Sequence, residues 1–344
     1  MNSHIADVAQ AAGVSTATVS RALRGLPNVS AQTRARVEQV AAELGYIADR
    51  SASRLASGRT LAVAVIAPYP ERWFFATAIS AVENELRAAG MDALLVGLTP
   101  PGVPREAFRP GALRGRVDAV IVLTVPLTGR ELDELRSLDL PTVFVGASVG
   151  GSMSVRIDDA RVAALAMEHL LALGHRRIAY IGGDPTQRLN FTTPADRRAG
   201  WLSSLREAGI EPASDWEHPG DFTAVGGALA VERLLALDPV PTAIFAASDE
   251  MAIGAMIRAQ RLGLNLPGDL SIVGVDGHDL SELLGLTTVE QPVAEQAARA
   301  ARMVLEDLRT GRSFGGEHVV MPVRLAVRDS TTTWCDRSLT VTQP

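Results

Sequence analysis

The chain has 344 residues, which is too many for one ordinary hydrophobic core and predicts two or three domains. Apolar residues make up 47% of the sequence and charged residues 21%, proportions that exclude a disordered or fibrous protein. The single cysteine, Cys335, excludes an internal disulfide framework. The sequence shows neither a secretory signal nor an apolar run of about 18 residues, which argues against export and against a membrane span. We therefore expect a cytoplasmic protein that meets no membrane.

The net charge of −6 is distributed unevenly along the chain. Residues 1–60 hold seven arginines against four acids, a net +3, whereas the remainder holds 26 basic against 35 acidic residues, a net −9. A basic first segment on an acidic body favours contact of that segment alone with a polyanion such as nucleic acid.

The first 23 residues predict two short helices joined by a tight turn. Apolar residues recur on one helical face of residues 5–12 and again on one face of residues 16–23. Gly13 supplies the backbone freedom that a tight turn needs, and the Ser15 hydroxyl is a good N-cap for the second helix. Two helices in this arrangement form a helix-turn-helix, a DNA-binding motif.

A third helix is predicted over residues 31–45, with Ser30 as its N-cap and Gly45 as its stop signal. Its inward-facing positions are Val37, Val40, Ala41 and Leu44. We therefore assign residues 1–46 to one helix-turn-helix domain. The polar, basic segment 47–60 has few core-forming residues, and we expect a hinge that is either flexible or helical only when bound.

From Leu61 onward, short apolar runs alternate with helical segments. Buried parallel strands are predicted over residues 61–67, 93–97, 119–123, 142–146, 178–183, 243–247 and 271–275. Helices are predicted over residues 76–89, 129–138, 159–173, 196–208, 224–237 and 250–262. This βαβ rhythm is typical of doubly wound α/β sheets.

The predicted strands are too many for one compact sheet, so we predict two lobes. The segment 291–329 is expected to cross between them and to contribute a helix over 294–309 and strands over 318–321 and 324–327. The expected domains are the head 1–46, the hinge 47–60, lobe one (about 61–160 plus 292–320), lobe two (about 162–290 plus 321–331) and a tail, 332–344. The tail lacks a leucine heptad, so dimers are expected rather than coiled-coil tetramers.

Motifs in order along the chain resemble the lactose-repressor/galactose-repressor (LacI/GalR) family over nearly its full length. They include DVAQAAGVSTATVSRAL (7–23), HLLALGHRRIAYIGG (169–183), PTAIFAASDEMAIGAM (241–256), LSIVGVDG (270–277), LTTVEQP (286–292) and RLAVRDST (324–331). The resemblance implies an α/β protein with an N-terminal all-α helix-turn-helix head and a two-lobed, periplasmic-binding-protein-like core of doubly wound parallel sheets. It also implies a transcriptional repressor that binds double-stranded DNA at a palindromic operator as a homodimer, under allosteric control by a small-molecule effector, a sugar or related metabolite.

In a helix-turn-helix, the second helix enters the major groove with its first residues at base edges. The resemblance assigns base readout to Thr16, Ala17 and Arg21, which stand on the helix face opposite Val19. The Arg21 guanidinium has the fork geometry to grip guanine O6 and N7. Phosphate contacts, which set register without reading sequence, are assigned to Ser15, Thr18 and Ser20.

Leu55 is a large apolar residue in the polar hinge. The resemblance implies that the hinge folds on the operator and inserts Leu55 between base pairs in the minor groove. Ala52 and Arg54 are expected to contact the DNA beside it. Insertion is easiest at a flexible central CG step. The alternative is that Leu55 packs on the surface of the core. Asp49 near the usual helix start and Ser53 where arginine is common are departures that should weaken phosphate attraction.

Ligands of two-lobed α/β proteins bind in the cleft beyond the carboxyl ends of the strands. The resemblance carries effector contacts over to Trp73, Phe74, Phe75, Arg197, Phe222, Ser248 and Asp276. Aromatic faces stack on sugars or flat rings, and aspartate and arginine hold hydroxyls by charge-assisted hydrogen bonds. The alternatives are core packing for Phe74 or Phe75, and a purely structural role for Arg197 or Asp276.

Two departures concern the predicted effector cleft. Ser248 replaces an amide residue that is frequent in the family, and Gly146-Ala147 replaces an acid–base pair. The alternatives are therefore an effector that is smaller, less polar or modified relative to a plain hexose, or none. The sequence does not encode whether the effector releases or tightens DNA binding. We expect release, because induction is commoner among sugar-responsive relatives.

Two other classes of function fit parts of the sequence. A solute-binding protein without DNA function would use the same core, but the 60-residue head and the missing export signal argue against it. An enzyme is not expected, because the six histidines form no metal-binding pattern and no P-loop, nucleophile elbow or paired catalytic carboxylates are evident. We therefore expect no cofactor, and structural roles for His169 and His175.

Overall fold

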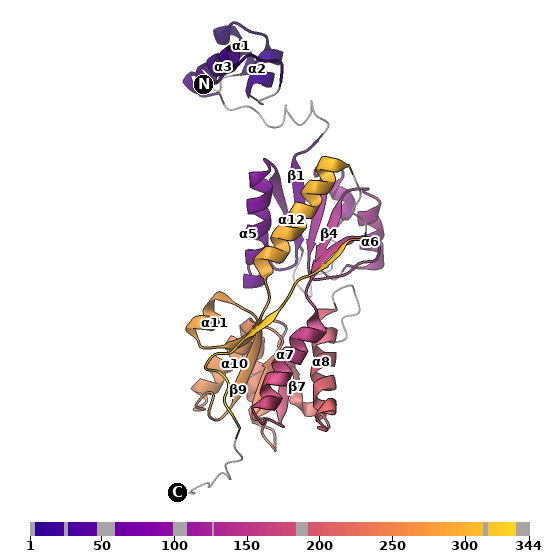
Figure 1. Ribbon diagram of the computed structural model, residues 1–344, viewed down its shortest axis with the longest axis vertical. Coiled ribbons are helices and arrows are strands. Elements are labelled where there is room, and N and C mark those ends of the chain that lie inside the picture. Colours follow the sequence, from indigo (N-terminus) through magenta and orange to yellow (C-terminus); the bar gives the residue numbers. More distant parts are fainter. Residues whose placement is uncertain are drawn as a thin grey trace. The chain divides into compact units, whose positions relative to one another are not determined.

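The computed structural model describes residues 4–23, 27–46, 59–98, 109–125, 127–183, 192–311 and 316–334. The chain divides into two compact units, Met1–Leu61 and Ala62–Pro344, which we call the head and the core (Figure 1). Each unit is described by itself. Among the described residues, no helix has both the length and the hydropathy that a bilayer crossing demands.

The head is built from three helices: α1 (Ile5–Ala12), α2 (Thr16–Leu23) and α3 (Ala31–Glu43). Gly13 has a positive φ of 64°, the left-handed conformation that the tight turn after α1 requires. The Ser15 and Ser30 hydroxyls each accept a hydrogen bond at 3.1 Å, from the backbone N–H groups of Thr18 and Thr33. The predicted turn and both predicted N-caps are therefore present.

Apolar faces of the three helices meet in one small core. Its buried members are Val8, Ala9, Ala12, Val19, Ala22, Val37 and Ala41. The expectation that Leu44 faces inward was wrong: this side chain is 39% exposed. The physical reason is that α3 ends at Glu43, so Leu44 is its C-cap and no longer follows the helical period.

Lobe one of the core is a parallel sheet in the order β11-β5-β4-β3-β1-β2. Its strands are β1 (Ala62–Ala67), β2 (Asp92–Gly97), β3 (Ala119–Leu123), β4 (Thr142–Val145), β5 (Met153–Arg156) and β11 (His318–Val320). One face packs against α5 (Trp73–Ala88) and α12 (Val293–Thr310), which lie side by side (Figure 1). The other face packs against α6 (Gly129–Arg136) and the 3-10 helix η2 (Pro110–Leu113). Because both faces are covered, β1 and β3 are buried along their whole length and appear in the sequence as continuous apolar runs.

Lobe two is a sheet in the order β12-β10-β9-β8-β6-β7, parallel except for the antiparallel pair β10–β12. Its strands are β6 (Ile178–Gly182), β7 (Glu217–Pro219), β8 (Ala243–Ala246), β9 (Ser271–Asp276), β10 (Thr287–Glu290) and β12 (Arg324–Ala326). Its helices are α7 (Asp159–Ala172), α8 (Thr193–Glu207), η3 (Ser214–Trp216), α9 (Ala224–Leu235), α10 (Asp249–Arg261) and α11 (Asp279–Leu283). Helices α7 and α8 pack together, and so do α9 and α10.

The chain passes between the two lobes three times: between β5 and α7, between β10 and α12, and between β11 and β12. Consequently α12 and β11 come late in the sequence but complete lobe one, whereas β12 returns to lobe two. Figure 1 shows the late, yellow part of the chain running through both lobes. The first two crossings leave β5 and β10 at their carboxyl ends, so the crossings lie beside the ends at which doubly wound sheets bind ligands.

Besides the two 3-10 helices, the sequence analysis missed three strands and one α-helix of the core: β5, β7, β10 and α11. The strands have the sequences MSVR, EHP and TTVE, which are too short and too polar to show as apolar runs. Helix α11 has only five residues, so no helical period develops. These elements form because neighbouring strands and helices already provide their hydrogen-bond partners and their contacts.

Candidate DNA-binding helix and effector cleft

The outward face of α2 carries the residues predicted to read DNA. Thr16, Ala17 and Arg21 are exposed, whereas Val19 of the same helix is fully buried in the core of the head. The residues predicted to contact phosphates lie at the start and flank of α2: Ser15 is exposed, and Thr18 and Ser20 are half-buried. The three base-reading candidates thus share one solvent-facing surface, as entry into a groove requires.

The hinge candidates Ala52, Arg54 and Leu55 lie outside the described residues. The described chain resumes at Arg59, and the core begins with β1 at Ala62. Insertion of Leu55 into the minor groove therefore stays a prediction.

All seven predicted effector residues lie in the core, near the ends of strands or the starts of the helices that follow them. Lobe one supplies Trp73, Phe74 and Phe75 in the first turn of α5, and lobe two supplies Arg197 in α8, Phe222 before α9, Ser248 before α10 and Asp276 at the end of β9. Helix α5 begins three residues earlier than expected, so the aromatic triplet is helical.

Arg197 is the centre of a buried ion-pair cluster in lobe two. Its side chain is 4% exposed, its Nε donates to Asp159 Oδ1 at 2.7 Å, and its Nη1 donates to the Ala247 carbonyl at 2.5 Å. Asp276 Oδ1 lies 4.0 Å from the same Nη1. The Thr193 hydroxyl donates to Asp159 Oδ2 at 3.0 Å. Two carboxylates therefore balance one buried guanidinium, a condition that a charge removed from water must meet.

The cluster continues into the crossing between β10 and α12. Gln291 Nε2 donates to Asp276 Oδ1 at 2.6 Å, and Gln296 Nε2 of α12 donates to Gln291 Oε1 at 2.9 Å. At the other end, Asp159 is the first residue of α7, directly after the crossing from β5. Two sets of hydrogen bonds, joined by the Arg197–Asp276 ion pair, thus reach two of the three segments that connect the lobes.

Sequence reasoning missed Asp159, Gln291 and Gln296. Gln291 stands in the LTTVEQP run that carried part of the family resemblance, so that run contained a usable signal. Asp159 and Gln296 lie on helices of otherwise ordinary composition, and only the tertiary contacts with Arg197 and Gln291 identify them.

Two buried carboxyl groups of the cleft have different roles. Burial raises the pKa of Asp276 to about 7, and the Arg197 guanidinium opposes this rise. Burial also raises the pKa of Asp249 to about 6. Hydrogen bonds from the Thr288 and Ser281 hydroxyls and from the backbone N–H groups of Gly277 and His278 oppose this rise. Asp249 has both oxygens occupied and is structural. Within the described chain, Asp276 Oδ2 accepts no hydrogen bond, which leaves this oxygen for a ligand hydroxyl.

An aromatic contact joins the two lobes beside this cluster. The Trp73 indole of lobe one stacks on the His278 ring of lobe two, with centroids 4.8 Å apart and an angle of 28° between the planes. The Trp73 backbone N–H also donates to Glu250 Oε1 at 3.3 Å, and Arg72 Nη1 donates to the Asp221 carbonyl at 3.3 Å. The indole Nε1–H is buried and has no hydrogen-bond partner, so it is a donor that a ligand can satisfy.

Backbone strain is concentrated around the same region. Of the non-glycine residues with positive φ, Thr124 (47°) follows β3, Asp221 (51°) and Phe222 (54°) follow β7, and Asp276 (124°) ends β9. Such conformations cost on the order of 1–3 kcal/mol each and persist mainly at functional sites. The Phe222 ring lies against the backbone of Gly183, where an added Cβ would stand 2.3 Å from a ring carbon. Only glycine admits the ring at that place.

At the positions that depart from the family pattern, the residues present offer a ligand fewer polar contacts. Ser248 is buried and caps α10, its hydroxyl accepting from the Met251 N–H at 3.3 Å. Gly146 has a φ of 72°, and a Cβ there would stand 3.0 Å from Thr124 Cγ2, while Ala147 is buried in the core. The Thr124 hydroxyl is buried without a partner, so Thr124 is an additional candidate that sequence reasoning missed.

The histidines that looked structural in the sequence have structural contacts. His175 is fully buried and is hydrogen-bonded to the Thr242 and Ser271 hydroxyls and to the Thr332 carbonyl. His169 is hydrogen-bonded to Thr331 at 2.9 Å. Across the residues that the structure describes, no group of three histidine, cysteine, aspartate or glutamate side chains could hold a metal ion.

A head with one exposed polar helix face, and a two-lobed core with a buried ion-pair cluster and an aromatic contact between its lobes, define a class of protein: DNA-binding regulators with a ligand-sensing core. Family models agree with both parts. Residues 4–49 match the bacterial regulatory proteins of the lacI family, and residues 167–331 match the periplasmic binding protein-like domain.

Individual relatives match along nearly the whole chain. Catabolite control protein A of Priestia megaterium is 33% identical over 335 residues, which cover 96% of this chain and 100% of the relative. The solved structure of the Lac repressor dimer bound to operator and the anti-inducer ONPF matches with a TM-score of 0.84, 29% identity and coverage of 96% and 100%. The transcriptional regulator CelR–cellobiose complex matches with a TM-score of 0.70, 29% identity and the same coverage.

The chain therefore belongs to the LacI family of bacterial regulatory proteins. This confirms the predicted family, the fold class and the function as a DNA-binding transcriptional regulator. These relatives are regulators and not enzymes.

Proposed function

We propose that this regulator acts in the cytoplasm as a homodimeric repressor on a palindromic operator, and that a small polyhydroxylated metabolite, a sugar or close relative, releases it from DNA. The observation that carries the proposal is the buried Arg197–Asp276 cluster, which is hydrogen-bonded to the segments connecting the lobes. Adjacent hydroxyls of a polyol can donate to Asp276 and accept from Arg197. The cellobiose and operator complexes of the structural relatives support this assignment.

The mechanism follows from where the cluster lies. A ligand hydroxyl that donates to Asp276 Oδ2 shares this carboxylate with Gln291, which donates to Oδ1, and so acts on the crossing between β10 and α12. The stacked pair Trp73–His278 and the bond from Trp73 to Glu250 hold the lobes together at the same cleft. Exchanging these contacts for ligand contacts changes the relative position of the lobes, and in a dimer this changes the spacing of the two hinges and heads.

The dimer surface that we propose lies on lobe two. Of the twelve large apolar side chains that are exposed in the described chain, seven belong to α9, α10 with its C-cap, and α11 with its C-cap. They are Val225, Leu229, Ile257, Leu262, Leu280, Leu283 and Leu284. A concentration of exposed apolar side chains on adjacent elements marks a protein–protein interface, and a second copy of this chain is the occupant that palindrome binding requires.

Replacing Leu283, which is 81% exposed, by arginine is expected to convert dimers to monomers at micromolar concentration. Because the side chain is exposed in the single chain, thermal stability of the monomer should change little. Light scattering after gel filtration measures the mass, and operator affinity should fall at least tenfold in parallel. Val327→Arg, at a 61% exposed position on the same lobe, is the matched control and should stay dimeric. A dimeric L283R protein would remove this surface from the proposal.

The proposed DNA contact is tested by Arg21→Ala on a labelled palindrome taken from the promoter next to the gene. Loss of a bidentate guanine contact removes about 1–3 kcal/mol of discrimination, so operator affinity should fall roughly tenfold to a hundredfold while affinity for random DNA changes far less. Arg36→Ala, an exposed arginine on α3, removes the same charge and should lower both affinities similarly. Fluorescence anisotropy at several salt concentrations measures both, since phosphate contacts give a steep salt dependence. Equal losses in the two variants would contradict base reading by Arg21.

A further inference from the structure

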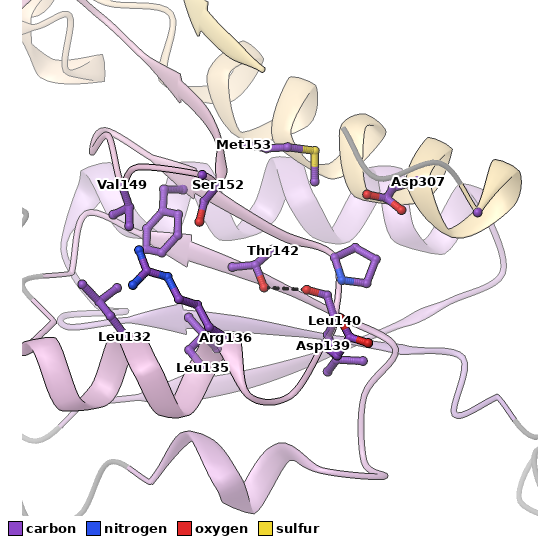
Figure 2. A pocket seen from close by; sticks show the side chains of 14 residues that line it. Leu132, Leu135, Arg136, Asp139, Leu140, Thr142, Val149, Ser152, Met153 and Asp307 are labelled. Carbon is purple, nitrogen blue, oxygen red and sulfur yellow. Dashed lines mark hydrogen bonds between the residues drawn. The ribbon is translucent and has the colours of Figure 1, made fainter. Parts of the chain in front are cut away.

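A pocket of about 290 Å³ lies in lobe one between α6 and the carboxyl-terminal part of α12 (Figure 2). It is lined by Thr142 and Met153, the first residues of β4 and β5, so it lies at the amino ends of these strands. The effector cleft lies at the opposite, carboxyl ends of the strands. The pocket is therefore separate from every site described above.

Asp307 of α12 contributes a buried carboxylate to this pocket. The residue is only 8% exposed, and Figure 2 shows its side chain across the pocket from Leu132 and Arg136 of α6. Within the part of the chain that the structure describes, its carboxylate has neither a hydrogen-bond donor nor an ion-pair partner. The nearest arginine along the helix, Arg309, is already paired with Glu306. A buried carboxylate without a partner is unfavourable unless something that enters the pocket satisfies it.

The remaining charges of the pocket favour a cation. Among the described residues of the lining, Arg136 is the only basic one, and its guanidinium already donates to Asp133 Oδ1 at 3.3 Å and to the Gly150 carbonyl at 3.2 Å. A second carboxylate, that of Asp139, stands on a backbone with a positive φ of 54°, a conformation that non-glycine residues keep mainly at functional sites. Among the lining residues that the structure describes, an anion would therefore meet two carboxylates and no uncommitted cation.

The rest of the lining combines apolar side chains with Thr142 and Ser152. Of the apolar residues, Leu132, Leu140 and Pro141 are partly exposed, whereas Leu135, Phe144 and Met153 are almost fully buried. A bare metal ion does not suit such a wall, because calcium and magnesium require six or more oxygen ligands and one buried carboxylate supplies two. An apolar body with one positive group matches both the wall and Asp307.

We propose that this pocket binds a small organic cation, a primary or secondary ammonium group on an apolar body, with the ammonium donating to Asp307 and the body packed on Leu132 and Leu140. This proposal does not depend on the identity of the effector in the cleft.

The pocket lies close in the sheet to β1, the first strand of the core. The backbone N–H of Asp118 donates to the Ala62 carbonyl at 2.7 Å, and that of Val120 donates to the Pro141 carbonyl at 2.9 Å. Pro141 precedes β4, and β3 alone separates β4 from β1 in the sheet. Strand β1 is the first element of the core. An amine bound here would be a second input to the regulator.

The test is titration of the intact protein with three probes of one shape: 2-phenylethylamine, 2-phenylethanol and phenylacetate. The amine should bind saturably, at least tenfold more tightly than the alcohol, and the anion should not bind. Location is read from the methyl NMR signals of labelled methionines: Met153 of the pocket should shift on amine binding, whereas Met251 beside Ser248 should not.

Asp307→Asn is expected to lower the affinity for the amine at least tenfold and to abolish its advantage over the alcohol. Glu295→Gln, at an exposed position near the start of α12, makes the same charge change outside the pocket and should leave binding unaltered, since its partner Arg302 keeps Glu85. The proposal is overturned if no amine binds at millimolar concentration, if Met153 stays unshifted, or if a folded D307N protein binds the amine as tightly as the parent. Circular dichroism and operator binding establish that both variants are folded.

Discussion

Replacing Arg197 by methionine is expected to lower the free energy of unfolding by about 3–5 kcal/mol and to abolish effector-induced release of DNA. The large cost arises because Asp159 and Asp276 stay buried after the guanidinium that balances them is removed. The deficit should grow as the pH rises above about 7. In the parent, burial raises the pKa of Asp276 to about 7 against the opposing Arg197 guanidinium, so the contribution of Asp276 to stability is present at low pH and is lost as the pH rises to that value. Without Arg197 this pKa is higher still, so the variant goes on losing stability where the parent has levelled off. Denaturant titrations at several pH values measure the stability, and operator titrations with sugars measure the response.

The neighbouring Arg198 provides a matched control. It pairs with Glu217 at a position where both side chains are partly exposed, and Arg198→Met should cost about 1 kcal/mol or less. Adding Asp159→Asn and Asp276→Asn to Arg197→Met should recover part of the stability without restoring the response, because the ligand contacts stay absent. If R197M were as stable as R198M and still responded to sugars, the cluster would not be the centre of the effector site.

Gly254→Ala is expected to destabilise lobe two by about 3 kcal/mol, at the upper end of the usual cost of overpacking. Gly254 lies on α10 where that helix packs on α9, and an added Cβ would stand 1.8 Å from the Ala224 carbonyl oxygen. A backbone atom cannot rotate away as a side chain does, so the two helices must separate. Gly226 and Gly227 of α9 make similarly close approaches, to Gly220 and Met251. The proposed dimer surface spans both helices, so dimerisation should weaken as well.

Gly129→Ala is the control for this substitution. Gly129 opens α6, and a Cβ there would have no neighbour within 4 Å, so alanine should be neutral or slightly stabilising. Thermal unfolding should be followed at one fixed protein concentration, since a dimer's apparent stability depends on concentration. A G254A protein that melts and dimerises like the G129A protein would show that α9 and α10 are less tightly packed than the structure indicates.

Much of the fold could be predicted because parallel strands covered on both faces must be apolar throughout. Strand β3 was predicted with its observed bounds, and β1, β4 and β8 within one residue at each end. Local chemistry located the helix starts equally well: Ser15 and Ser30 cap the helices they were expected to cap. The short polar strands β5 and β10 could not be predicted, because their strand state depends on neighbours in the sheet.

The cleft could be predicted only in part. Aromatic residues after β1, and Arg197 and Asp276, were identified from motifs, but their partners were not. Asp159 lies 38 residues from Arg197 along the chain, and Gln291 lies 15 residues from Asp276, and no local pattern links such pairs.

By itself, the sequence determined that this protein has a helix-turn-helix head, a two-lobed α/β core and membership in the LacI family, because caps, periodicity and ordered motifs are properties of neighbouring residues. Only the tertiary structure decided which carboxylates balance Arg197, why Gly254 must be glycine, and that Asp307 lines a pocket without a partner. Those features depend on three crossings between the lobes and on helices that meet far from their place in the chain. Burial and pairing energies arise only when such distant residues come into contact.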